Sequence, residues 1–158
     1  MGIGDSGSLH HTCFIVRDLE ATARRLAASL GVDWQVWTLE PEHCTVHGGA
    51  VPYSCRVAIA PLGSSNLELI EPVSGDSVYV EHLETRGEGF HHTCIAFSDP
   101  AAMHQARGDL EAREWEMIQS GRVGDAAEFY YFRIPDTDSV LELLWIDELP
   151  PPEATIAS

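Results

Sequence analysis

Two nearly identical segments constrain the fold of this chain more than any other feature of its sequence. Residues 9–16 (Leu-His-His-Thr-Cys-Phe-Ile-Val) and 90–97 (Phe-His-His-Thr-Cys-Ile-Ala-Phe) each place a His pair before a β-branched and aromatic stretch, which predicts a strand. Each segment is followed by a helical pattern and later by a Leu-Glu-Leu strand, centred on Glu68 in one case and on Glu142 in the other. The chain is therefore predicted to contain two copies of one structural unit.

Each copy has the order strand, helix and three strands, which predicts an α+β fold with two βαβββ modules forming a cupped, eight-stranded sheet. Residues 39–51 are polar with two glycines and are interpreted as a long loop. The prolines at 150–152 cannot continue a sheet, so we expect disorder after them. The predicted division of the chain is a flexible lead-in at 1–8, a first module at 9–74, a linker helix within 75–88, a second module at 89–147 and a disordered tail at 148–158.

The net charge of the chain limits the classes of partner that it can bind. The formal net charge is −16, which argues against binding to nucleic acid or an anionic membrane and leaves a small-molecule substrate. No apolar run approaches the roughly 20 residues of a membrane span, and residues 1–8 lack the features of a signal peptide, so a cytoplasmic location with reduced cysteines is expected. The basic residues are all arginines, which excludes lysine Schiff-base chemistry.

The His pairs are candidate metal ligands. Side chains alternate between the two faces of a strand, so one His of each pair should face the cup and the other the helices. The bulky residues after each pair suit packing under a helix, which leaves His11 and His92 for the cup. His10 and His91 are the alternatives.

The same alternation applies to the two Leu-Glu-Leu strands. The leucines on either side of Glu68 and Glu142 are expected to face the helices, which directs both glutamates into the cup. A buried carboxylate is costly unless it is paired or bound to a cation. The alternative interpretation is that the strands are half-exposed and that the glutamates meet solvent.

Two imidazoles and two carboxylates form a mixed donor set that suits a divalent ion and leaves open positions for a substrate. The sequence therefore predicts one divalent ion per chain, which can be cobalt, zinc, nickel or manganese. Its predicted ligands are His11, Glu68, His92 and Glu142.

Arg56 is the candidate for binding an anionic group of the substrate. It lies in the predicted strand 53–61, where bulky residues alternate with small or polar ones, and it belongs to the small-residue face. The alternative interpretation of Arg56 is a surface charge.

Two stretches carry a resemblance to a known family. Residues 81–92 (Glu-His-Leu-Glu-Thr-Arg-Gly-Glu-Gly-Phe-His-His) and residues 67–72 (Leu-Glu-Leu-Ile-Glu-Pro) resemble the vicinal oxygen chelate superfamily, which has the glyoxalase fold, and within it methylmalonyl-CoA epimerase. The resemblance covers roughly residues 9–146. It implies paired βαβββ modules, one divalent ion at the four ligands named above, and a homodimer.

The resemblance also implies a reaction. A metal-stabilised enolate would form on a small acyl thioester or dicarbonyl-type substrate, with Glu142 serving as ligand and base in turn. One departure concerns the second acid/base, since the epimerases carry a Glu-Gln-Gly stretch where residues 51–54 read Val-Pro-Tyr-Ser. Candidates to replace that carboxylate are Tyr53, Tyr130 and Tyr131.

Three other functions fit parts of the pattern. A glyoxalase I-type lyase would use the same four ligands. An extradiol-type dioxygenase would use two His and one Glu with Fe(II), and Glu68 as a fourth ligand argues against it. A non-catalytic, resistance-type binding protein often lacks the metal ligands, so the presence of all four favours an enzyme.

Overall fold

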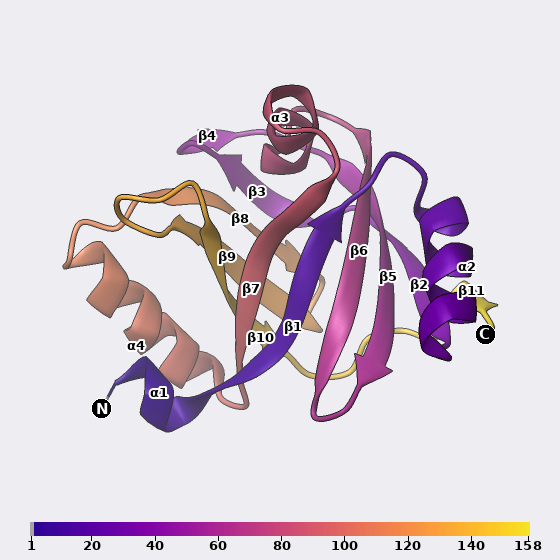
Figure 1. The fold of residues 1–158 in the computed structure, drawn as a ribbon. Helices are drawn as coiled ribbons and strands as arrows, with labels where there is room; N and C mark the ends of the chain where they lie inside the picture. The colour runs from indigo at the N-terminus through magenta and orange to yellow at the C-terminus, as the bar shows by residue number, and fades with distance from the viewer. Residues whose placement is uncertain (1) are drawn as a thin grey trace.

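The computed structural model describes residues 2–158, and its main feature is one strongly curved sheet (Figure 1). Within residues 2–158 the sheet has 11 strands, in the order β11-β2-β5-β6-β1-β7-β10-β9-β8-β3-β4. The elements up to the linker are α1 (Ile3–Ser6), β1 (Gly7–Ile15), α2 (Leu19–Leu30), β2 (Trp34–Leu39), β3 (Glu42–Val46), β4 (Gly49–Ala50), β5 (Ser54–Leu62) and β6 (Ser65–Ser74). The remaining elements are α3 (Val78–Thr85), β7 (Gly89–Phe97), α4 (Pro100–Glu111), β8 (Met117–Val123), β9 (Ala127–Arg133), β10 (Val140–Ile146) and β11 (Ala154–Ile156).

The two modules are built alike. β1 lies parallel to β6 in the first module, and β7 lies parallel to β10 in the second. β1 and β7 pair antiparallel and join the two modules into one sheet. The predicted α+β fold with paired βαβββ modules is confirmed, and β3, β4 and β11 extend the predicted eight strands to 11.

The helices begin and end where the sequence supplies caps. The Asp18 carboxylate accepts a hydrogen bond from the backbone N–H of Ala21 at the start of α2, and Gly31 ends that helix with a φ of 66°. Asp99 caps α4 in the same way, with Pro100 in the first turn. α2 and α4 each pack on the outer face of their own module (Figure 1), so the inner face of the sheet is left for the site.

The segment after β2 differs from the prediction. Residues 39–51 were expected to form a loop, but they contain the β3–β4 hairpin, and β3 pairs with β8 of the second module. This pairing covers an edge of β8 that would otherwise present unpaired backbone groups.

The chain termini also differ from the prediction. In the tail, the proline run ends before β11, which pairs antiparallel with β2 and buries Ile156 in the cluster beneath α2. The lead-in contains the short helix α1 and the first residues of β1, which pair with β7. The prediction of disorder at 148–158 was wrong because the free edge of β2 offers a partner that local composition does not reveal.

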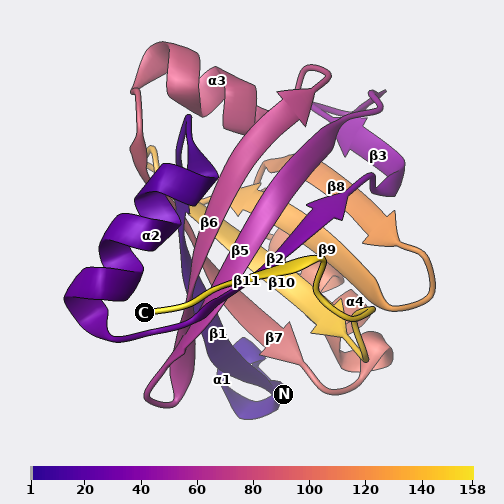
Figure 2. The same ribbon diagram turned by 90° about the vertical axis from the view of Figure 1, so that its right-hand side faces the viewer.

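Two connections run between the modules in opposite directions. Residues 40–41 lead from β2 in the first module to β3 beside the second, and residues 147–153 lead back from β10 to β11 beside the first. Figure 2 shows the second connection in yellow, ending beside β2 and α2. Among residues 2–158, no helix combines the length and apolarity of a membrane span.

Gly75, which follows β6 on the way to α3, is expected to be intolerant of a side chain. Its φ is +79°, and a Cβ would lie 2.2 Å from the carbonyl oxygen of Pro52 and 2.8 Å from the Cα of Tyr53. Gly75→Ala is expected to destabilise the fold by about 2–4 kcal/mol, because alanine disfavours the positive φ and its Cβ would clash with the backbone of Pro52 and Tyr53. Urea unfolding measures the change, with Gly63→Ala as the control, since Gly63 has a similar φ and open space around it. Equal losses in both variants would contradict the clash.

Candidate metal centre

Both His pairs lie at β-bulges in the ladder between β1 and β7. Leu9 is opposite Ile95 while His11 is opposite Cys94, so His10 is the extra residue on β1. The ladder shifts again where Cys13 faces His92 and Phe14 faces Phe90, which makes His91 the extra residue on β7. Strict alternation therefore breaks within each pair, and His10 lines the cup together with His11.

The four predicted ligands come together on the four central strands. His11 Nε2 lies 3.0 Å from Glu68 Oε2 and 3.1 Å from Glu142 Oε2. His92 Nε2 lies 3.0 Å from Glu142 Oε2 and 3.5 Å from Glu68 Oε2, and the two Nε2 atoms are 3.1 Å apart. All four side chains are buried, and each module supplies one His and one Glu.

The donor set fits a divalent ion. Glu68 Oε2 and Glu142 Oε2 are fully buried and make no well-directed hydrogen bond, so both oxygens lack a partner that burial requires. Ligand atoms held at about 2.1 Å from one ion are separated by about 3.0–3.4 Å. The separations within the cluster are close to this range, so the four side chains can hold a metal ion.

Each imidazole of the cluster is held by the other His of its pair. Nδ1 of His10 lies 2.7 Å from Nδ1 of His11, and Nδ1 of His91 lies 2.8 Å from Nδ1 of His92. One ring of each pair donates to the other, which fixes the ring orientation with Nε2 directed at the glutamates. The structure thus places His11 and His92 in the cluster, and His10 and His91 behind them.

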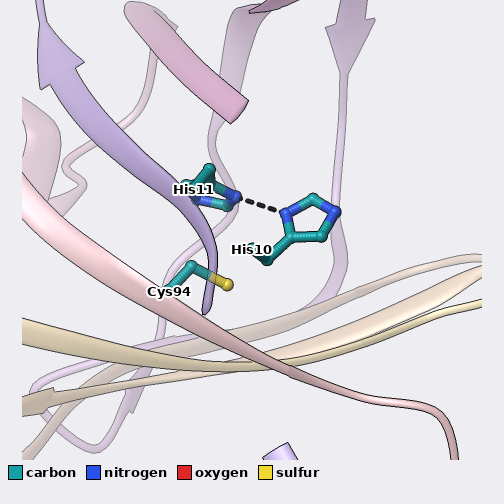
Figure 3. Close-up of side chains that lie close together, drawn as sticks. All are labelled: His10, His11 and Cys94. Atoms are coloured by element: carbon teal, nitrogen blue, oxygen red, sulfur yellow. Dashed lines mark hydrogen bonds between the residues drawn. The ribbon is translucent and has the colours of Figure 1, made fainter. Parts of the chain in front are cut away.

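A second group of possible ligand atoms lies beside the first. Figure 3 shows His10 and His11 joined by their hydrogen bond, with the Cys94 side chain close by. These three residues offer ligand atoms within 4.8 Å of one another. The Nδ1–Nδ1 distance of 2.7 Å is that of a hydrogen bond and is shorter than the spacing of about 3.0 Å expected for two ligands of one ion.

The charges of the cluster stabilise one another. Burial works against ionisation of Glu68 and Glu142, yet the neighbouring His11 and His92 hold the pKa of both carboxyl groups well below the usual value, at about 2 for Glu142. Burial likewise works against protonation of His11 and His92, yet the two glutamates raise the pKa of each imidazole, that of His11 with a further contribution from Cys94. In the metal-free cluster the carboxylates are thus favoured as anions and the imidazoles are favoured in the protonated form.

Metal uptake is consequently expected to release protons. The two glutamates raise the pKa of both imidazoles and so favour their protonated form in the metal-free protein, whereas a metal ion binds only the neutral form. We therefore expect protons to be released when the ion binds, with an affinity that rises as the pH rises. Calorimetric titration with zinc in buffers of different ionisation enthalpy counts the protons. His104→Gln, on the exposed face of α4, serves as the control, and binding without proton release would contradict the raised pKa values.

His11, Glu68 and Glu142 of the cluster line a pocket that opens to solvent. Apart from the cluster residues and His10, the wall is apolar or aromatic. The lining residues besides the cluster are His10, Trp37, Leu39, Pro41, Cys55, Val57, Ile59, Ile70, Tyr79, Val123, Ala127, Phe129, Tyr131, Leu144, Ile146 and Leu149.

The structure does not bring Arg56 to this pocket, which corrects the prediction. Cys55, Val57 and Ile59 line the cup, whereas Ala58 and Ala60 belong to the cluster beneath α2, so Arg56 lies on the outer face of β5. The small residues are on the helix side because they let α2 approach the sheet closely. The face of β5 that carries the larger side chains Cys55, Val57 and Ile59 forms the wall of the cup.

The three candidate tyrosines are separated by the fold. Tyr131 lines the pocket, its ring centroid lies 4.8 Å from that of His92, and its hydroxyl is 2.8 Å from that of Tyr79. Tyr130 faces outward, with the Arg107 guanidinium over its ring. Tyr53 is buried but is not part of the pocket wall. Burial raises the pKa of Tyr131 well above its usual value, so this hydroxyl keeps its proton.

The fold is thus a pair of βαβββ modules that bring two imidazoles and two carboxylates together in one apolar cup. Residues 10–132 match the sequence profile of the Glyoxalase/Bleomycin resistance protein/Dioxygenase superfamily. The chain belongs to this superfamily. No curated protein matches the chain at a significant level.

Solved structures resemble the whole chain at low sequence identity. A hypothetical protein from Bacillus halodurans C-125 is 20% identical with a TM-score of 0.65, covering 92% of this chain and 98% of that one. Methylmalonyl-CoA epimerase from Mycobacterium tuberculosis is 19% identical with a TM-score of 0.62, covering 89% of this chain and 88% of that one. A variant of the Streptomyces coelicolor epimerase in complex with 2-nitronate-propionyl-CoA is 21% identical with a TM-score of 0.61, covering 90% and 99%. At these identities the likeness shows the fold alone.

Proposed function

We propose that this protein is a metal-dependent isomerase or epimerase that moves a proton next to a carbonyl group, acting through an enolate on a small acyl thioester or dicarbonyl-type substrate. The observation that carries the proposal is the buried cluster of His11, Glu68, His92 and Glu142, in which two carboxylate oxygens lack hydrogen bonds. The epimerase structures of the same fold support the reaction class.

The four cluster residues would hold one divalent ion, with the wall of the cup keeping bulk water away. A bound ion supplies a Lewis acid that stabilises negative charge developing on a substrate oxygen. Glu142 is the proposed proton acceptor, because it is an ionised carboxylate that lines the pocket. Tyr131 keeps its proton and lines the same pocket from β9, where it pairs with Glu142 of the neighbouring strand β10, so it is the proposed proton donor.

Solvent deuterium exchange tests the proposal directly. The metal content is measured first, and the loaded protein is then incubated in D2O with the N-acetylcysteamine thioester of methylmalonate. Incorporation of deuterium at the carbon between the two carbonyl groups, above the rate without protein, is the expected result. Metal-loaded protein that exchanges no deuterium into this thioester or into simple dicarbonyl compounds would overturn the proposal. Conversion of the methylglyoxal–thiol hemithioacetal instead would assign the glyoxalase-type lyase.

We also propose a homodimer, since the outer face of β1 and β7 exposes apolar side chains between the two helices. Leu9 is 52% exposed and Phe90 is 44% exposed, and Phe14 packs against Phe90. Sedimentation velocity is expected to give twice the chain mass, with Phe90→Glu shifting the protein to the monomer. A wild-type monomer at high protein concentration would contradict the dimer.

A further inference from the structure

The charge balance of the cup limits what the cup can bind. The nine arginines all lie outside the pocket lining, and the chain has no lysine. The two negative charges of Glu68 and Glu142 would neutralise one divalent ion, so the loaded centre would have no net positive charge. Besides the ligand His11, the pocket lining contains one more basic side chain, that of His10, and its Nδ1 is hydrogen-bonded to His11.

An anionic group of a substrate placed against the wall of the cup would therefore lose its water without gaining a positively charged partner. Trp37, Val57, Ile59 and Phe129 present apolar surface there, and burying an unpaired charge on such a surface is strongly unfavourable. The net charge of −16 adds a long-range repulsion against polyanions such as nucleotide-bearing thioesters. The same wall is favourable for a hydrocarbon or aromatic group.

The connection from β10 to β11 limits the size of that group. Leu149 belongs to the connection from β10 to β11 and lines the pocket. This connection is fixed to β2. The indole N–H of Trp37 donates to the carbonyl oxygen of Pro150 at 2.8 Å, and the Glu153 carboxylate accepts from the backbone N–H and the hydroxyl of Thr38 at 2.9 Å. These bonds hold the segment that carries Leu149 in place in the pocket wall.

We infer that the site takes a compact substrate whose metal-binding oxygens carry an uncharged apolar group, and that Leu149 sets the upper size of this group. This inference rests on the proposed function and narrows its substrate class. It disfavours a coenzyme tail or a second carboxylate inside the cup. Leu149 acts here as a specificity-determining residue and takes no part in proton transfer.

Binding of hydroxamates to zinc-loaded protein tests the inference, because a hydroxamate presents two neighbouring oxygens to a metal ion. By calorimetry, benzohydroxamate is expected to bind at least about tenfold more tightly than 4-carboxybenzohydroxamate. The 4-tert-butyl analogue is expected to bind weakly to the wild type and about tenfold better to Leu149→Ala. Leu149→Phe is expected to weaken benzohydroxamate binding, which gives a second variant with the opposite effect. Leu62→Ala, on the exposed end of β5, is the matched control.

Failure of the inference and failure of the proposed function give different results. Equal affinity for the neutral and carboxylated hydroxamates, or no response to either Leu149 variant, would overturn the inference while metal binding stays intact. Metal-free protein is tested with the neutral fluorophore N-phenyl-1-naphthylamine, whose binding is expected to be sensitive to both Leu149 variants. If the protein takes up no metal but binds this fluorophore as expected, the enzyme proposal fails and the apolar specificity of the cup stands.

Discussion

Glu142→Gln is expected to abolish deuterium exchange, with a loss of about 10²–10⁴-fold in rate, because the residue is the proposed base as well as a ligand. Glutamine keeps the shape of the side chain but removes the negative charge that both imidazoles approach within about 3 Å. Removing a residue that only hydrogen-bonds to a metal ligand typically lowers metal affinity by about 10–100-fold, so removing a ligand itself is expected to lower it by about 100-fold or more.

Two measurements separate these effects. Competition with a chromophoric chelator gives the metal affinity, and exchange assayed at saturating metal gives the chemical effect alone. Glu84→Gln, on the exposed side of α3, is the matched control and should behave as wild type. A Glu142→Gln protein that binds metal normally and retains full exchange would remove Glu142 from both roles.

Metal removal is expected to lower the melting temperature strongly. The ion would join His11 and Glu68 of one module to His92 and Glu142 of the other, and an ion present at a thousandfold excess over its Kd stabilises the folded state by about 4 kcal/mol. For a chain of this size the loss corresponds to about 8–16 °C.

Differential scanning calorimetry of the zinc-loaded and chelator-treated proteins measures the shift. Glu142→Gln serves as the reference, since its melting temperature should respond much less to added zinc. Wild-type protein whose melting temperature is the same with and without zinc would show that the cluster does not bind the ion in the folded state.

The repeat made most of the site predictable. The two Leu-Glu-Leu strands and the His pairs recur at equivalent places, so the pattern predicted that Glu68 and Glu142 would approach His11 and His92. This worked because alternation along a strand is local information, and the four residues lie on the four central strands.

The rest depended on partners that are distant in the sequence. The bulges at His10 and His91 arise from the register between β1 and β7, and no pattern within either strand indicates them. Arg56 was assigned to the wrong face because small residues suit either a cup or a closely packed helix. β11 forms because β2 has a free edge, which the composition of the tail cannot show.

The two connections that run in opposite directions also make the halves of the duplication interdependent. The edge of β2 in the first half is covered by β11 from the end of the chain, and the edge of β8 in the second half is covered by β3 from the first. A fragment cut within the linker before β7 would therefore leave each half with an exposed edge and half of the ligand set. Such fragments should be poorly folded apart and should regain structure when mixed, so the modules behave as one cooperative unit despite their repeated sequence.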